Sequence, residues 1–301
     1  MREYLFDIAG FVFEVIVSDN IDIEKLLPSF GPFRYDSFDK VKPFFRFCVN
    51  CGGVMDAFDE RYVFVDESVN DMGRVRLYSS DDKYCIKISF MDDDMEHIAF
   101  ADKCFHKIYA SVNMADKYAG EVISSLLRMI FSQAIIPYGG ISVHASSVLL
   151  DGKSYLFMGK SGTGKSTHSA LWIKAFEGCS LINDDNPVIF IKNGVIMASG
   201  TPWSGKTPCY RNVVVPVGGI VRLRQAMVNR FTVCNGFESF VNILPGCSVI
   251  KKDAGLQNEM HDTLASVCES VNIGVMECLP DIEAAFICRQ ELEKSNIRIN
   301  E

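Results

Sequence analysis

A glycine-rich segment near the middle of the chain constrains the fold more than any other feature. Residues 159–166 read Gly-Lys-Ser-Gly-Thr-Gly-Lys-Ser and fit G-x-x-x-x-G-K-[ST], the pattern of a phosphate-binding loop. The apolar run 155–158 before it is typical of a buried strand, and residues 167–176 after it carry apolar side chains at helical spacing. A strand, a glycine loop and a helix N-terminus in this order predict an anion site, because the helix dipole adds to the free backbone N–H groups.

The loop combines three kinds of residue, each with a chemical task. Its glycines let the backbone turn sharply and bring N–H groups close to phosphate oxygens. The ammonium of Lys165 suits the β- and γ-phosphates, and the hydroxyl of Ser166 suits Mg²⁺, so ATP and Mg²⁺ are the expected cofactors. The expected nucleotide-binding residues are Gly159, Lys160, Ser161, Gly162, Thr163, Gly164, Lys165, Ser166 and Thr167.

The composition is that of a globular protein and argues against several other classes. Of the 301 residues, 48% are hydrophobic and 23% are charged, which allows an ordinary core. A net charge of −8 argues against a nucleic-acid partner, and the absence of an apolar run of 18 residues argues against a membrane span. The charged start does not resemble a signal peptide. The 11 cysteines, an odd number, are most simply free thiols, so we expect a cytoplasmic protein.

Two domains are predicted, a β-rich one over residues 1–112 and a nucleotide-binding one over residues 113–301. In the first, short alternating runs are separated by Asp, Asn, Ser and Gly. The longest helical pattern, residues 114–136, opens the second domain. The strands expected in the first domain cover residues 4–17, 43–49, 62–65, 73–78 and 84–91.

Two clusters in the first domain invite a metal interpretation that their spacing does not favour. Residues 92–94 are three adjacent aspartates, which do not converge easily on one cation and are typical of a solvated turn. Cys48 and Cys51 form a single C-x-x-C without the second pair or the histidines that zinc would need. We interpret this pair as structural.

In the second domain, residues 141–150 read as one strand, which Asp151-Gly152 turns back into the strand before the loop. Helices are expected over residues 255–270 and 281–294. The other expected strands cover residues 179–182, 187–192, 195–199, 216–224, 230–234 and 273–279.

Asp184 and Asp185 follow a predicted strand soon after the loop helix. The intervening length fits one helix and one strand, so we expect the strand that carries the acids to lie beside the loop strand. Adjacent carboxylates at a strand end point to different sides. One can therefore hold Mg²⁺ while the other accepts a proton from an attacking hydroxyl. The alternative is a polar turn before Pro187.

His144 lies on the strand that precedes the loop hairpin. Pairing of the two strands would bring it towards the phosphates and the aspartates, where an imidazole can orient a carboxylate or tune its proton affinity. The alternative is a satisfied histidine in the core or at a sheet edge.

Three motifs together resemble one superfamily, that of HPr kinase/phosphorylase and ATP-dependent phosphoenolpyruvate carboxykinase. The resemblance covers roughly residues 135–225, and the tail in outline, and it implies a mixed-sheet P-loop α/β domain, here preceded by the β-rich domain. It also implies transfer of the γ-phosphoryl group of ATP to a hydroxyl, with Asp184 as base and Asp185 as a ligand of Mg²⁺ together with Ser166. The motifs are His144-Ala145-Ser146, the loop itself and Leu181-Ile182-Asn183-Asp184-Asp185.

Departures from the family patterns leave the acceptor open. The further basic motifs of the carboxykinases are not matched, and residues 201–206 stand where the HPr enzymes carry a glycine-rich signature. The acceptor is then a protein serine or a small molecule, and the oligomeric state, including a homo-oligomer, stays open. Lys206 and Arg211 are candidates for a cation near the γ-phosphate, with ordinary surface charge as the alternative. A non-catalytic ATP-binding module and a carboxykinase-like lyase are the competing functions.

Overall fold

The computed structural model of the protein describes residues 1–37, 41–52, 57–70, 73–90, 95–205 and 207–299. Contacts within the chain define two compact units, Met1–Ala134 and Ile135–Glu301. The boundary lies at the end of the long helix and not near residue 112, where the sequence pattern put it. The three adjacent aspartates at 92–94 lie outside the described residues.

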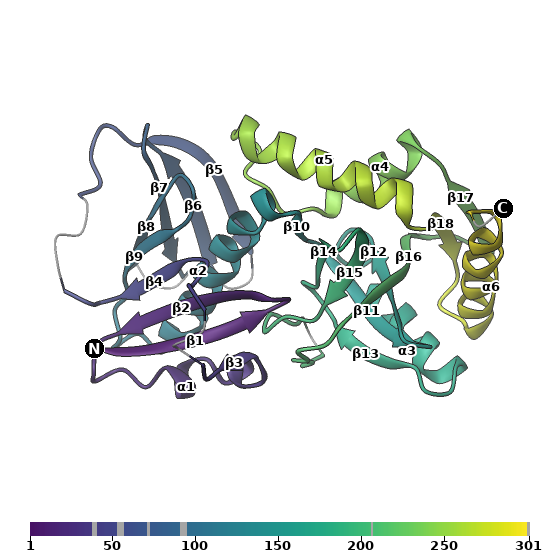
Figure 1. The fold of residues 1–301 in the computed structure, drawn as a ribbon, viewed down its shortest axis with the longest axis horizontal. Helices are drawn as coiled ribbons and strands as arrows, with labels where there is room; N and C mark the ends of the chain where they lie inside the picture. The colour runs from purple at the N-terminus through teal and green to yellow at the C-terminus, as the bar shows by residue number, and fades with distance from the viewer. Residues whose placement is uncertain (38–40, 53–56, 71–72, 91–94, 206, 300–301) are drawn as a thin grey trace. The chain divides into compact units, whose positions relative to one another are not determined.

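In the first unit, the described residues form a mixed sheet of nine strands (Figure 1). Neighbouring strands are antiparallel, except that the strand that starts at Arg46 is parallel to both of its neighbours. In spatial order the strands are β3 (Arg34–Tyr35), β1 (Arg2–Ile8), β2 (Phe11–Val17), β4 (Arg46–Val49), β9 (Lys107–Ser111), β8 (Glu96–Asp102), β7 (Lys83–Ser89), β6 (Gly73–Ser79) and β5 (Val63–Asn70).

The single strand expected over residues 4–17 is wrong, because the chain reverses in its middle. Ala9 and Gly10 have φ angles of 62° and 89°, the two positive values that a tight hairpin turn of type I′ requires. β1 and β2 therefore pair in antiparallel register. The sequence pattern also missed β3, β8 and β9, whereas β4 to β7 overlap with the expected strands.

The long helix α2 (Ala119–Ala134) belongs to the first unit by its contacts. The ring of Phe131 lies 5.9 Å from that of Phe13 and 6.2 Å from that of Phe11, both on β2. At Gly120 a Cβ atom would stand 2.6 Å from the carbonyl oxygen of Leu26, at the end of α1 (Ile23–Leu26), so the close approach requires glycine. The 3-10 helix η1 (Pro28–Phe33) follows α1.

The second unit is built on a mixed sheet in which the long strand β16 (Val214–Gln225) is shared by two groups of strands. The first group is, in spatial order, β10 (Gly140–Ser142), β14 (Val188–Lys192), β15 (Val195–Ser199) and the start of β16. The second is β13 (Ser180–Asn183), β11 (Ala145–Leu150), β12 (Lys153–Met158), the rest of β16, β18 (Ile273–Cys278) and β17 (Arg230–Cys234). This architecture is a mixed α/β one, as expected.

Helices complete the second unit (Figure 1). α3 (Lys165–Ala175) packs against β11, β12 and α6 (Ile282–Ile299), whereas α5 (Ala254–Ser270) contacts β10 and β15. The connections contain η3 (Ile136–Tyr138), α4 (Phe237–Ile243) and η4 (Leu244–Gly246), none of which was expected. None of the helices in the described ranges combines the length and the apolar character needed to cross a bilayer.

The direction of the strands brings the sequence motifs to one edge of the sheet. β12, β16 and β18 are parallel and end at this edge, and β13 ends there too because it is antiparallel to β11. β11 begins at the same edge, since Asp151 and Gly152 form the expected tight turn at the opposite one, with φ angles of 51° and 74°. The expectation that β13 lies beside β12 is wrong, because β11 separates them.

The core beneath this edge contains a buried histidine on α3. The ring centroid of His168 lies 4.7 Å from that of Phe157 on β12, and its Nε2 accepts a hydrogen bond of 3.1 Å from Nε1 of Trp172. Burial in this apolar setting lowers the pKa of His168 to about 4, because a charged imidazolium would lose its hydration.

This histidine should make the stability of the second unit depend on pH. In the unfolded chain His168 binds a proton below pH about 6.5, whereas in the folded protein it stays neutral down to pH about 4. The contribution of neutral His168 to the free energy of unfolding should therefore be complete above pH 6.5. The free energy of unfolding should then fall by up to about 3 kcal/mol as the pH falls towards 4. Urea unfolding of His168→Gln should show a shallower decline than the wild type over this range, since glutamine keeps an acceptor for Trp172 without titrating. The exposed His106→Gln is the control, and a decline identical in all three proteins would contradict the assignment.

Candidate functional site

The glycine loop has the backbone geometry of an anion site. It leaves β12 at Met158, and α3 begins at Lys165 directly after Gly164, whose φ is 104°. Gly162 also has a positive φ, of 78°, which a side chain would strain. Within the loop, the N–H and the hydroxyl of Thr163 both donate to the carbonyl oxygen of Lys160, at 3.1 and 2.7 Å. The first N–H groups of α3 have no partner inside the helix, so they remain available to an anion.

Lys165 is the buried cation of the loop, with 9% of its surface exposed. Its Nζ donates to the carbonyl oxygen of Gly159 at 3.2 Å and lies 2.8 Å from Nε2 of His144. Burial lowers the pKa of Lys165 from its ordinary value, while the carboxylates of Asp185 and Asp184 raise it. The lysine expected to meet the phosphates is thus held at the centre of the site.

His144 reaches the site because the chain breaks between β10 and β11. The single strand expected over residues 141–150 is therefore wrong: β10 pairs with β14, and β11 pairs with β12 and β13. At the break, the N–H of His144 donates to the carbonyl oxygen of Gly246 at 2.8 Å, and Val143 bridges to Cys247. The backbone of the histidine is thereby fixed by η4 and not by a neighbouring strand.

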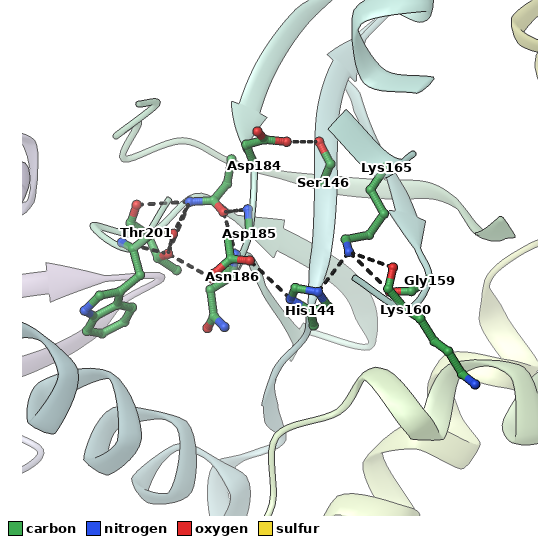
Figure 2. A network of polar contacts seen from close by, with 11 residues as sticks. His144, Ser146, Gly159, Lys160, Lys165, Asp184, Asp185, Asn186 and Thr201 are labelled. Carbon is green, nitrogen blue, oxygen red and sulfur yellow. Dashed lines mark hydrogen bonds and ion pairs between the residues drawn. The ribbon is translucent and has the colours of Figure 1, made fainter. Parts of the chain in front are cut away.

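The imidazole of His144 connects the loop lysine to an aspartate (Figure 2). Its Nε2 faces Nζ of Lys165, and its Nδ1 lies 3.2 Å from Oδ1 of Asp185. An ammonium group can only donate, so Nε2 accepts, and Nδ1 then carries the hydrogen that is donated to Asp185. These contacts place a histidine nitrogen within direct reach of the aspartate pair, as the hairpin argument predicted.

The two aspartates have different surroundings. Asp184 is 5% exposed, and its Oδ1 accepts a hydrogen bond of 2.8 Å from Ser146, whose hydroxyl also lies 2.6 Å from that of Ser169 on α3. The other oxygen, Oδ2, is buried and has no hydrogen-bond partner among the described residues. Asp185 is half-buried and faces His144. The pair therefore points in two directions, as Figure 2 shows.

The sequence motif contains Asn183 without indicating a role for it, but in the structure this residue organises the turn that carries the two aspartates. Its Oδ1 accepts from the N–H groups of Asp185 and Asn186 at 3.0 and 2.8 Å. Its Nδ2 donates to the carbonyl oxygens of Thr201 and Trp203 at 3.1 and 3.0 Å. The amide thereby fixes the turn and attaches the loop after β15 to it. Trp203, which lies in this loop, is itself buried.

Arg211 and Lys206 are the two cations that the sequence offers for the γ-phosphate. Nη1 of Arg211 donates to the hydroxyl of Ser180 at 3.0 Å and to the carbonyl oxygen of Leu181 at 2.7 Å. These residues begin β13, whereas the aspartates follow its end, about 10 Å further along the strand. Arg211 is thus not brought to the site. Lys206 lies outside the described residues.

An open cavity of about 280 Å³ flanks the start of α3. Thr167 and Leu171 of α3 line it on one side, and Leu279 and Pro280 after β18 line it on another. The lining is largely apolar, and the loop glycines form its edge. Such a cavity next to an anion site suits a neutral, flat ring system attached to a phosphate chain.

Comparison with protein-family models gives no match, and neither does comparison with curated proteins. Among solved structures, the chain is similar to the HPr(Ser) kinase/phosphatase from Coxiella burnetii, with a TM-score of 0.31 and 12% sequence identity. The match covers 53% of this chain and 99% of that chain. This likeness is weak and concerns the fold alone, so the chemistry of the site has to be inferred from the residues themselves.

The role of Asn183 can be tested with an isosteric change. Asn183→Asp removes the two N–H donors and sets a carboxylate against the carbonyl oxygens of Thr201 and Trp203. Unpaired buried polar groups of this kind should lower the free energy of unfolding by about 3 kcal/mol, measured by urea denaturation. Asn193→Asp, at an exposed hairpin turn, should change it by less than about 0.5 kcal/mol. Equal midpoints for the two variants would show that the amide does not organise the turn.

Proposed function

We propose that this protein binds ATP with Mg²⁺ and transfers the γ-phosphoryl group to a hydroxyl, on a protein serine or a small molecule. The observation that carries the proposal is the continuous set of contacts from Lys165 of the loop through His144 to Asp185. Each of the three residues comes from a different segment of the chain. A cation for the phosphates supplies electrostatic stabilisation, and a positioned carboxylate can accept the proton of an attacking hydroxyl, both of which assist phosphoryl transfer.

The residues present fit a nucleotide and a divalent cation. The loop glycines with positive φ, together with the N–H groups of the first turn of α3, suit phosphate oxygens. Oδ2 of Asp184 is a buried carboxylate oxygen without a partner among the described residues, a costly arrangement that a cation would relieve. Ser166 lies one helical turn before Ser169, hence on the face of α3 that meets Ser146 and Asp184. Asp184 and Ser166 would therefore hold Mg²⁺.

This assignment exchanges the roles that the family resemblance implies for the two aspartates. Asp184 is nearly inaccessible, so an acceptor hydroxyl could not easily reach it, whereas a metal ligand needs only one free oxygen. No group of three or more metal-binding side chains occurs in the described ranges. Mg²⁺ bound partly through phosphates needs no such group, because one or two carboxylates suffice.

Asp185 is then the general base. It is half-buried, so an acceptor can approach it, and the Nδ1–H of His144 holds its Oδ1 in place. Asp185 accepts the hydroxyl proton as the hydroxyl oxygen bonds to the γ-phosphorus and the bond from that phosphorus to the leaving oxygen breaks. Lys165 supplies fixed positive charge to the β- and γ-phosphates. Mg²⁺, if held by Asp184 and Ser166, would neutralise further negative charge on the phosphates. The nucleoside would occupy the apolar cavity beside Thr167 and Leu171.

Nucleotide binding is tested at the loop lysine. Lys165→Met keeps the apolar stem but removes the charge, and each lost charge-assisted bond is worth about 1.5–3 kcal/mol. We expect the Kd for Mg·ATP to rise by about 10- to 100-fold. Titration calorimetry would measure it, with circular dichroism as a check of the fold. The surface variant Lys192→Met should bind as the wild type does, and equal affinity for all three proteins would refute the loop assignment.

Turnover and metal dependence should separate the two aspartates. Asp184→Asn should raise the Mg²⁺ concentration needed for half-maximal ATP consumption, because an amide is a weaker ligand. Asp185→Asn should leave that concentration unchanged and lower kcat by about 10²- to 10⁴-fold, since a base is lost. Acceptor-dependent turnover, sought with labelled ATP and a set of protein and small-molecule hydroxyls, distinguishes a kinase from a binding module. Identical Mg²⁺ curves and undiminished turnover in both variants would mean that the pair only forms a turn.

A further inference from the structure

A second cavity, of about 550 Å³, lies beside the loop. Its floor is the end of β16, which flanks β12 on the side opposite to β11 and the aspartates. The outer face of the loop, from Lys160 to Thr163, forms one wall, and Val241, Asn242 and Pro245 of α4 and η4 form another. The cavity therefore borders the phosphate site from the side that the aspartates and His144 do not occupy.

Arg222 enters this cavity from the strand next to the loop strand. It pairs in parallel register with Met158, the residue immediately before Gly159. Its neighbours Val221 and Leu223 are buried in the core shared with α3 and α6. Because side chains alternate along a strand, Arg222 projects from the other face, where it lines the cavity. The cation thus stands one strand away from the start of the loop.

The charge of Arg222 has no counterpart in the described protein. The side chain is half-buried, and its guanidinium forms no hydrogen bond or ion pair with any described residue. Lys160 and Arg224 line the same cavity, and none of its lining residues is acidic. Burial lowers the pKa of Arg222, and Arg224 lowers it further. A half-buried cation among cations is costly unless an anion joins it.

This charge also acts on the site itself. Arg222 is among the groups that lower the pKa of Lys165, so the two side chains are close enough to influence one another. An anion that is bound by Lys165 therefore also experiences the field of Arg222. Of the two candidates for a cation near the γ-phosphate, Lys206 lies outside the described residues and Arg211 does not reach the site, whereas Arg222 lies next to the loop.

We propose that Arg222 is a further catalytic residue, which contacts the phosphates of the nucleotide from the β16 side and stabilises the charge that develops during phosphoryl transfer. This inference rests on the proposed function of the loop. In the transition state, negative charge increases on the oxygen that leaves with the β-phosphate. A guanidinium already fixed on a strand meets this charge without reorganisation, and its effect therefore falls on kcat more than on ground-state binding.

The test compares ground-state and transition-state binding in Arg222→Met and Arg222→Lys. The probes are Mg·AMPPNP, a non-hydrolysable ATP analogue, and Mg·ADP with fluoroaluminate, which mimics the phosphoryl group in transfer. Titration calorimetry of the full chain should give a Kd for Mg·AMPPNP within about threefold of the wild type. Arg222→Met should lose about 100-fold or more of the tightening that fluoroaluminate gives to Mg·ADP, with a similar loss in kcat. Arg222→Lys should keep part of both.

Arg230→Met is the control, because Arg230 on β17 pairs with Glu277 on the adjacent strand β18 and does not line the cavity. It should behave as the wild type does in every measurement, and thermal melts would show that all variants are folded. If the wild type binds neither probe, the proposed function fails and this inference with it. If it binds both, two results overturn the inference alone: unchanged fluoroaluminate binding in Arg222→Met, or an equal loss for both probes, which would make Arg222 a residue for ground-state binding.

Discussion

The carboxamide of Asn183 is the contact on which the candidate site depends. It joins the turn that carries the aspartates to the loop after β15 through hydrogen bonds at both of its ends. The turn fixed in this way offers the carbonyl oxygen of Asp185 to the N–H of Ala145 and its carboxylate to the ring of His144. The histidine in turn contacts Lys165. One buried amide thus determines where the carboxylate, the imidazole and the ammonium group meet.

The intervening strand β11 gives the site its chemical order. In a sheet where only carboxyl ends of strands met, the loop and the aspartates would be direct neighbours. Here an antiparallel strand begins between them, so the start of β11 supplies the connecting groups: His144 towards Lys165 and Asp185, and Ser146 towards Asp184. Adjacent strands lie about 5 Å apart, so β12 and β13, with β11 between them, are about 10 Å apart. The side chains of His144 and Ser146 bridge this distance. On the other side of the loop, Arg222 comes from a parallel strand, where a long side chain can reach towards the phosphates without a bridge.

The sequence predicts the local structure around the candidate site better than the order of its strands. The loop, the hairpin turn at Asp151-Gly152 and the strand before Asp184 follow from local patterns, because turns and glycine loops require particular residues. The break at Val143 and His144 could not be predicted, since the run 141–150 is uniformly strand-like and the interruption comes from contacts with η4. Insertion of β11 between β12 and β13 is likewise decided by tertiary packing. Charge alone could not distinguish Arg211 from Arg222, because only strand direction and register decide which one reaches the loop.

The tight turn at Asp151 and Gly152 has a consequence for how the protein can be modified. It is exposed, and it joins β11 to β12 at the edge of the sheet opposite to every residue of the candidate site. At the surface, Asp151 of this turn pairs with Arg289 on α6. Extra chain inserted between the two residues would lengthen a surface loop, whose closure costs little additional entropy. A fluorescent reporter or an affinity tag can therefore be placed there to follow the protein without altering the chemistry at the far edge.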